Sequence, residues 1–293
     1  MQGLVSIVVP AFNRGFVIGA ALESVLKQTY QYWEALIVDD GSTDDTKETV
    51  RDYARSDSRI RLIEHRHQKG AQAARNTGIR NARGTWIAFL DSDDRWLPHS
   101  LETRLGLMQK GLHQVVHSDC YMLSPGSNNL ERFGVPPMQG QVYRELLGRS
   151  GPMFPALLVS KSALTAINYL DENIVAYQEW DTAIRLAKHF AFQFMVEPTF
   201  VYDCRHANTI SKDSLKEARG YEQIVNKHRW SILRHLGPRA LANHYRKAEF
   251  FYLQAKHEEY ANRCLVRAVT CWPFSSGLLS GGKKHFLKLI SKR

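Results

Sequence analysis

Long apolar runs are absent from this chain of 293 residues, although 44% of its residues are hydrophobic. No segment approaches the about 18 consecutive apolar residues that a membrane-spanning helix needs. The apolar run at residues 4–9 is too short for a secretory signal, and no basic residue precedes it. We therefore expect a cytoplasmic, globular protein with enough core for one large or two modest domains.

Cysteine is scarce as well, and one glycine motif is missing. The four cysteines lie far apart without C-x-x-C spacing, which indicates neither a zinc site nor a disulfide framework. No G-x-G-x-x-G follows the first apolar run, which argues against a dinucleotide-dependent oxidoreductase. The sequence therefore gives no support to zinc proteins, disulfide-stabilised proteins or nicotinamide enzymes.

Acidic residues are missing from residues 261–293, which hold seven Lys or Arg, so most of the net charge of +10 is a C-terminal feature. In residues 281–293 basic residues stand among apolar ones, and such a segment could lie on the anionic inner face of a membrane. A frayed, solvated terminus is the alternative. The candidate site residues elsewhere are acidic, so we expect no nucleic-acid partner.

Apolar runs and helical patterns alternate in the first third of the chain. This alternation predicts a parallel sheet with helices on both faces, and in such sheets ligands bind at the carboxyl ends of the strands. The predicted strands are residues 5–10, 33–38, 60–64 and 85–90.

Three segments with candidate site residues come at or directly after the ends of these strands. They are residues 10–13, 39–40 and 91–94. We expect them to converge because parallel strands end at the same edge of a sheet. Ser42 and Asp45 have the spacing of a capping box, which predicts the start of the next helix and leaves both aspartates in the loop before it.

Three carboxylates, Asp91, Asp93 and Asp94, follow the fourth predicted strand. Asp91 and Asp93 flank Ser92 and are close enough to share one cation. Mg²⁺ and Mn²⁺ favour oxygen ligands and keep open positions that phosphate can fill. The motif therefore suggests a metal-diphosphate site. The alternative is a loop in which an aspartate caps the helix that begins near Pro98.

The alternation loosens beyond Trp96. A loop is expected at residues 124–140, which are rich in Pro, Gly and Asn. A helix is expected at residues 177–189, and two acids, Glu179 and Asp181, stand near its start. These acids either complement the helix dipole or supply a reactive carboxylate to the cleft.

The last third of the chain predicts helices and shows no internal repeat at a fixed period. The helical patterns cover residues 217–236, 240–255 and 258–271. We therefore predict two domains, a first at residues 1–212 and a helical extension with a basic tail at residues 213–293.

Four motifs stand in the order and at the spacing of one family, namely VSIVVPAFNR, ALIVDDGSTDDT, KGAQAARNTGIRNARGTWIAFLDSDDRW and QEWDTAIRLA. On these motifs the sequence resembles the family 2 glycosyltransferases, which are inverting enzymes with a GT-A type fold. The resemblance covers roughly residues 4–210. It implies an α/β fold with a mostly parallel nucleotide-binding sheet flanked by helices, followed here by a helical C-terminal extension.

The resemblance also implies how the donor is bound. Asp40 would hydrogen-bond the base of a nucleoside diphosphate sugar with support from Asp39, and Arg75 would neighbour the ribose and diphosphate. Asp91 and Asp93 match a metal-binding D-x-D motif. The nucleotide-contacting positions implied in this way are Pro10, Ala11, Asn13, Asp39, Asp40, Arg75, Asp91 and Ser92.

The catalytic position departs slightly from the family pattern. Many members have Glu-Asp where this chain has Gln178-Glu179, and the second position carries the general base. Glu179 keeps a carboxylate there but is one methylene longer than aspartate, so a role for Asp181 stays open. His206 matches a loop position that adds a metal ligand in some members, and an ordinary loop histidine is the alternative.

Together the resemblance and the residues predict an inverting glycosyltransferase that depends on a divalent metal, Mn²⁺ or Mg²⁺. It would move a sugar from a nucleoside diphosphate sugar, first of all a UDP-sugar, to a saccharide or lipid-linked acceptor, as in cell-surface polysaccharide synthesis. The alternative is a non-catalytic nucleotide-sugar-binding subunit of a glycan-assembly complex. The carboxylate at Glu179 favours catalysis.

Overall fold

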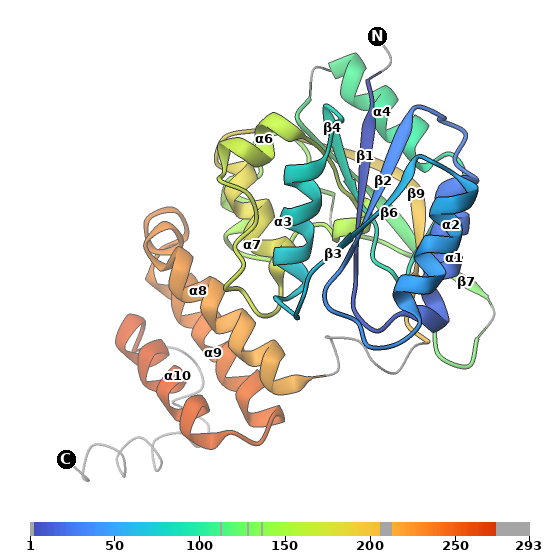
Figure 1. Cartoon of the computed structure of the whole chain (residues 1–293). Helices are drawn as coiled ribbons and strands as arrows, with labels where there is room; N and C mark the ends of the chain where they lie inside the picture. Colours follow the sequence, from blue (N-terminus) through green and yellow to red (C-terminus); the bar gives the residue numbers. More distant parts are fainter. Residues whose placement is uncertain (1–2, 112, 128, 136, 206–212, 274–293) are drawn as a thin grey trace. The chain divides into compact units, whose positions relative to one another are not determined.

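The computed structural model describes residues 3–273 apart from residues 112, 128, 136 and 206–212 (Figure 1). The chain forms two compact units. The first comprises Met1–Leu146, Ser150–Asn173 and Gln178–Asn208, and the second comprises Leu147–Arg149, Ile174–Tyr177 and Thr209–Arg293. The second unit thus takes in two short segments from the middle of the chain. The domain boundary expected after residue 212 stays a prediction.

Four parallel strands form one half of the sheet in the first unit. In chain order these strands and their helices are β1 (Val5–Ala11), α1 (Gly15–Leu26), β2 (Trp33–Asp39), α2 (Thr46–Ser56), β3 (Ile60–Glu64), α3 (Ala71–Asn81) and β4 (Trp86–Phe89). The strand order is β3-β2-β1-β4. Every residue of β2 is buried, as expected for a strand that is covered on both faces. Figure 1 shows α1 and α2 on one side of these strands and α3 on the other.

The other half of the sheet mixes parallel and antiparallel neighbours. Its strands are β5 (Arg95–Trp96), β6 (Val115–Leu123), β7 (Leu130–Phe133), β8 (Leu158–Ser160) and β9 (Phe192–Asp203). β8 pairs antiparallel with both β4 and β6, whereas β6 runs parallel to β9. The loop predicted at residues 124–140 contains β7, all of whose residues are exposed, so no buried face marks this strand in the sequence.

Three further helices of the first unit are α5 (Tyr143–Leu146), α6 (Lys161–Ala166) and α7 (Gln178–Ala187). The boundaries of α7 lie inside the helix predicted at residues 177–189. Ser160 caps α6, because its Oγ accepts a hydrogen bond from Ala163 N at 3.1 Å. This cap fixes the point at which α6 begins after β8.

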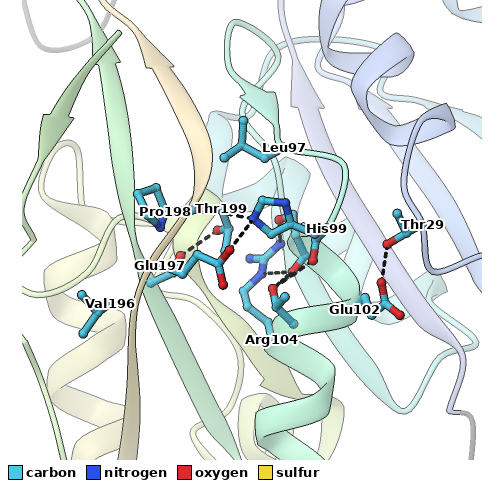
Figure 2. Close-up of polar contacts among 12 residues, drawn as sticks. Thr29, Leu97, His99, Glu102, Arg104, Val196, Glu197, Pro198 and Thr199 are labelled. Atoms are coloured by element: carbon cyan, nitrogen blue, oxygen red, sulfur yellow. Dashed lines mark hydrogen bonds and ion pairs between the residues drawn. The ribbon is translucent and has the colours of Figure 1, made fainter.

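Helix α4 (Ser100–Gly111) carries a fully buried arginine, Arg104 (Figure 2). Its Nη1 donates to the backbone carbonyls of Pro155 at 3.0 Å and Leu157 at 3.2 Å. Burial lowers the pKa of Arg104 to about 9. The guanidinium thus donates to backbone oxygens and to the Ser100 hydroxyl, and it holds the short 3₁₀ helix η1 (Phe154–Ala156) against α4.

The second unit is helical, as predicted. Its helices are α8 (Ser214–Leu236), α9 (Pro238–Gln254) and α10 (Glu258–Cys271). Asp213 caps α8 by accepting a hydrogen bond from Lys216 N at 3.0 Å, and Gly237, with a φ of 87°, ends it. None of the helices in the described part of the chain is both long and apolar enough to cross a membrane. The basic stretch at residues 281–293 lies outside the described residues.

Candidate active site

The first two polar loops are tied to each other at the carboxyl ends of β1 and β2. Asn13 adopts a left-handed φ of 53°, its N donates to Ser42 Oγ at 2.9 Å, and its Oδ1 accepts from Thr43 N at 2.9 Å. Because Ser42 Oγ is used in this way, the predicted capping box is wrong. Helix α2 starts at Thr46, and its N-cap, Asp45, makes no side-chain cap bond.

Pro10 and Ala11 end β1 at the same edge of the sheet. They pair with Val38 and Asp39 of β2, so the first predicted loop lies directly beside the two aspartates. Ala11 is buried and Pro10 is partly exposed. A proline at this point leaves no N–H unpaired, which suits the end of a strand.

The two aspartates after β2 are bound differently. Asp39 is fully buried, and its Oδ2 accepts from Ser42 N at 3.0 Å, but its Oδ1 has no hydrogen-bond partner among the described residues. Asp40 accepts from the backbone N–H groups of Lys69 at 2.9 Å and Gly70 at 2.7 Å. Asp40 thereby links the β2 loop to the loop before α3.

Arg75 joins the β4 edge to the start of α7. Its Nη2 donates to Asp91 Oδ1 at 2.5 Å, and its Nη1 donates to Gln178 Oε1 at 3.3 Å. The guanidinium also stacks on Phe154, with 4.2 Å from its central carbon to the ring centroid. The arginine side chain is only 7% exposed, so these contacts fix its orientation. Asp91 and Gln178, which are far apart in sequence, therefore both accept hydrogen bonds from the Arg75 guanidinium.

The acids after β4 crowd one another. Asp91 keeps about a third of its side chain exposed (32%), whereas Ser92 and Asp94 are buried. Burial and the charges of Asp91 and Asp93 raise the pKa of Asp94 well above its ordinary value. Asp94 Oδ1 accepts from Asp203 N at 3.1 Å, which anchors the acidic loop to the end of β9.

Glu179 and Asp181 occupy the first turn of α7 but have different surroundings. Glu179 keeps partial exposure, yet the surrounding protein desolvates it and raises its pKa; the charge of Asp91 acts in the same direction and that of Arg75 against it. Asp181 is buried, and its Oδ2 accepts from Arg185 Nε at 2.9 Å. The structure thus brings Glu179 into the electrostatic neighbourhood of Arg75 and Asp91, whereas Asp181 is paired with Arg185.

The described residues contain no group of three or more His, Cys, Asp or Glu side chains arranged to hold a metal ion. His206, the predicted loop ligand, lies outside the described residues. Asp91 and Asp93 still offer the oxygen donors that Mg²⁺ and Mn²⁺ prefer. Burial is the largest cause of the raised pKa of Asp94, and the charges of Asp91 and Asp93 add to it; a bound cation would relieve this second contribution. The residues present therefore fit a divalent metal held by carboxylates and a ligand's phosphate oxygens.

Three contributors to this site carry no motif in the sequence. Phe154 lies under Arg75, Asp203 anchors the acidic loop, and His65 contacts Asp40. Each comes from a segment whose pairing is set by tertiary structure. The only hint of these contacts in the sequence is Asp94, the third acid of the DSDD run, and the sequence does not indicate that its partner is Asp203.

Comparison with known proteins identifies the family of this chain. The chain matches Glycosyl transferase family 2 over residues 6–156. It is 37% identical over 166 residues to the UDP-Glc:alpha-D-GlcNAc-diphosphoundecaprenol beta-1,3-glucosyltransferase WfgD of Escherichia coli. The aligned region covers 57% of this chain and 64% of that protein. This chain is 40% identical over 107 residues to the putative teichuronic acid biosynthesis glycosyltransferase TuaG of Bacillus subtilis, 36% of this chain and 42% of that protein. The chain thus matches less than two thirds of the length of these relatives.

Solved structures share the fold at low sequence identity. S. aureus TarS 1-349 in complex with UDP-GlcNAc aligns with a TM-score of 0.62 and 16% identity, covering 89% of this chain and 90% of that one. The mannosyltransferase PcManGT from Pyrobaculum calidifontis, in complex with GDP-Man and Mn²⁺, aligns with a TM-score of 0.63 and 16% identity, covering 94% and 89%. The chain has the α/β fold of the GT-A type. Because the family match covers more than half of the sequence, this protein belongs to glycosyltransferase family 2.

Proposed function

We propose that this protein transfers a sugar with inversion from a nucleoside diphosphate sugar to a saccharide or lipid-linked acceptor. The observation that carries the proposal is the position of Arg75, whose guanidinium contacts Asp91 at 2.5 Å and Gln178, next to Glu179, at 3.3 Å. The carboxylate of Asp91, on the donor side, and Glu179, the candidate base, thus lie near the same fixed guanidinium group. The presence of Glu179 in this setting argues against a non-catalytic subunit.

The donor would lie along the carboxyl edge of the parallel strands. Asp40, supported by Asp39, would face the base, and Arg75 would neighbour the ribose and diphosphate. The remaining nucleotide contacts in this proposal are Pro10, Ala11, Asn13, Asp91 and Ser92. UDP is the first candidate nucleotide, because WfgD is named for UDP-Glc and TarS was solved with UDP-GlcNAc.

Asp91 and Asp93 would hold a divalent metal, Mn²⁺ or Mg²⁺, through carboxylate oxygens, and His206 remains a predicted additional ligand. When bound, such a cation supplies neutralisation of the charge that grows on the departing nucleoside diphosphate. Arg75 adds a positive charge beside Asp91 that does not depend on the metal. Asp94, which is buried and bound to the end of β9, would hold the acidic loop in place.

Glu179 would act as the general base. It would take the proton of an acceptor hydroxyl as the oxygen attacks the anomeric carbon and the bond from that carbon to the diphosphate oxygen breaks. One displacement inverts the configuration and needs one base. A raised pKa makes Glu179 a stronger base than an ordinary glutamate, provided that the pH keeps it ionised. Asp181 would instead hold Arg185 and stabilise α7.

The acceptor is proposed from the relatives. WfgD is named for a GlcNAc-diphosphoundecaprenol acceptor and TuaG for teichuronic acid biosynthesis, so a lipid-linked saccharide in cell-surface polysaccharide synthesis is the first candidate here. The protein would then act at the cytoplasmic side of a membrane, and contact through residues 281–293 remains part of this proposal.

The test combines donor binding with turnover. Calorimetric titration of the wild type with UDP should show binding that requires Mn²⁺ or Mg²⁺, and Asp93→Ala should abolish this metal-dependent binding. Incubation with UDP-glucose and a synthetic GlcNAc-diphospholipid should release UDP and extend the lipid-linked saccharide. A folded wild-type protein that binds no nucleoside diphosphate with either metal would overturn the proposal.

A further inference from the structure

Asp40 is held by a histidine that no sequence motif predicts. His65 directly follows β3, and its Nδ1 lies 2.7 Å from Asp40 Oδ1. Its Nε2 lies 2.9 Å from Oγ1 of Thr77 in α3. The side chains of His65 and Asp40 are only 6% and 4% exposed, so both ends of the imidazole are fixed inside the protein. Since an ionised carboxylate only accepts hydrogen bonds, Nδ1 carries the hydrogen.

Most of the acceptor capacity of Asp40 is used by the protein itself. Oδ1 accepts from His65 and from Lys69 N at 2.9 Å, and Oδ2 accepts from Gly70 N at 2.7 Å. A carboxylate offers about four acceptor positions, two on each oxygen. Within the part of the chain that the structure describes, hydrogen bonds therefore fill both positions on Oδ1 and one of the two positions on Oδ2.

The remaining acceptor position lies on Oδ2, the oxygen to which Gly70 N donates. A Cβ at Gly70 would meet no atom within 4 Å. Gly70 also has a φ of 101°, which residues with side chains rarely adopt. The conformation of Gly70, and not a lack of room for a side chain, thus favours glycine at the point where the backbone N–H reaches Oδ2.

We propose that His65 is a positioning residue that sets the base specificity of the donor site, because it leaves Asp40 a single acceptor position on Oδ2. This inference rests on the proposed function, in which Asp40 faces the base. One fixed acceptor selects a base whose pairing edge carries a ring N–H, as uracil, thymine and guanine do. Cytosine and adenine in the same position would present a bare ring nitrogen to Oδ2, so two acceptors would face each other without a hydrogen. Their exocyclic amino group could donate to Oδ2 only after a shift of the base, which the fixed carboxylate disfavours.

His65 prevents the Asp40 carboxylate from turning to suit a different base. Without the imidazole, Oδ1 would regain an acceptor position and the carboxylate could turn about its last side-chain bond. A water molecule could then donate to the ring nitrogen of cytosine and remove the penalty. Loss of His65 should therefore lower selectivity between bases more than it lowers the binding of the diphosphate.

The experiment is calorimetric titration of the full-length protein with UDP, CDP, GDP and ADP in the presence of Mn²⁺. UDP and CDP are a matched pair of one size that differs at the pairing edge, and GDP and ADP are the corresponding purine pair. For the wild type we expect UDP to bind about 10- to 100-fold more tightly than CDP. His65→Phe, which keeps a ring but no donor, should reduce this ratio to about threefold or less.

Two variants separate positioning from a general loss of structure. His65→Asn places an amide nitrogen near the position of Nδ1 and should restore most of the UDP/CDP ratio. His67→Phe makes the same change at an exposed histidine of the same loop and should leave the ratio as in the wild type. Thermal unfolding checks that each variant is folded, and Thr77→Val, which removes only the partner of Nε2, replaces His65→Phe if that variant does not fold.

The outcomes distinguish this inference from the function on which it rests. Equal affinity of the wild type for UDP and CDP, together with metal-dependent binding, would overturn the base selection and leave the proposed function standing. An unchanged ratio in folded His65→Phe would overturn the role of His65. Binding of none of the four nucleotides would overturn the proposed function and this inference together.

Discussion

The edge of the sheet in the first unit and the interior of the helical unit both gather charged groups, but they balance them differently. At the sheet edge, Asp91, Asp93 and Asp94 crowd one another, and the pKa values of Asp94 and Glu179 are raised. In the helical unit, Glu222 is buried and accepts from Tyr252 at 2.7 Å, Arg267 at 2.6 Å and Arg263 at 3.2 Å.

The difference lies in what neutralises each cluster. The charge of Glu222 is matched within its own unit by two arginines and a hydroxyl, so this cluster serves the fold. The acids of the sheet edge repel one another although Arg75 pairs with Asp91, so this edge keeps negative charge that a cation could balance. The comparison therefore predicts that changes at the sheet edge affect turnover and ligand binding, whereas changes at Glu222 affect stability.

The largest expected effect is at Glu179. Glu179→Gln keeps the size of the side chain but removes the base, and kcat should fall about 10³-fold. The affinity for UDP should stay close to that of the wild type, and the free energy of unfolding should be no lower than that of the wild type, because glutamine carries no desolvated charge. Steady-state kinetics with UDP-glucose, together with calorimetry and urea unfolding, measure all three quantities.

Asp181→Asn is the matched control, two residues along the same helix. It weakens the ion pair with Arg185, so it should lower the free energy of unfolding by about 1–2 kcal/mol and kcat by less than about tenfold. If instead Asp181→Asn abolished turnover in a stable protein while Glu179→Gln remained active, the base would be Asp181.

An intermediate effect is expected at Glu222. Glu222→Ala leaves Tyr252 and two arginines without their shared acceptor, which should lower the free energy of unfolding by about 3 kcal/mol. The lower end of the range for buried pairs applies because the Arg263 and Arg267 side chains are 49% and 40% exposed. Urea unfolding followed by circular dichroism measures this loss, and Glu222→Gln, which keeps an acceptor oxygen, should lose less. A large drop in kcat without any loss of stability would contradict the structural role.

The parallel half of the fold could be predicted from the sequence because each of its strands is a short apolar run that ends in polar residues. That pattern correctly indicated that the segments containing Ala11, Asp39 and Asp91 follow neighbouring strands. The mixed half was harder. β7 is exposed throughout, and β5 has only two residues, so neither has a hydrophobic period to detect.

The sequence could predict which residues form the site, but it could not predict which residues they would contact. The sequence pointed to Ser42 as a helix cap, but its hydroxyl binds Asn13 N, because the two loops lie side by side only after the strands have paired. For the same reason the sequence could not distinguish Glu179 from Asp181. Asp181 is bound by Arg185 four residues later, a spacing that many helices show without such burial.

The smallest expected effect is a pH dependence that links the two properties of Glu179. Its pKa is raised above the ordinary value of 4.5 in the folded protein, so between these two pKa values the folded state binds more protons than the unfolded state. The contribution of Glu179 to the free energy of unfolding is therefore fully present below pH 4.5 and is lost as the pH rises through the folded-state pKa. Catalysis should change in the opposite direction, because kcat rises as Glu179 loses its proton over the same interval.

Asp94 also has a raised pKa and gives the wild type a slope of the same sign, so the informative quantity is the difference between wild type and Glu179→Gln. Glu179→Gln cannot lose a proton at this position, and its free energy of unfolding should rise relative to that of the wild type as the pH increases. Urea unfolding of both proteins across the acidic range measures this difference, and kcat of the wild type follows the same titration. If the difference in stability did not change with pH while kcat still did, another group would be the titrating base. If both changed over one interval, the same carboxylate that is unfavourably desolvated on folding would be the group that accepts the proton in the reaction.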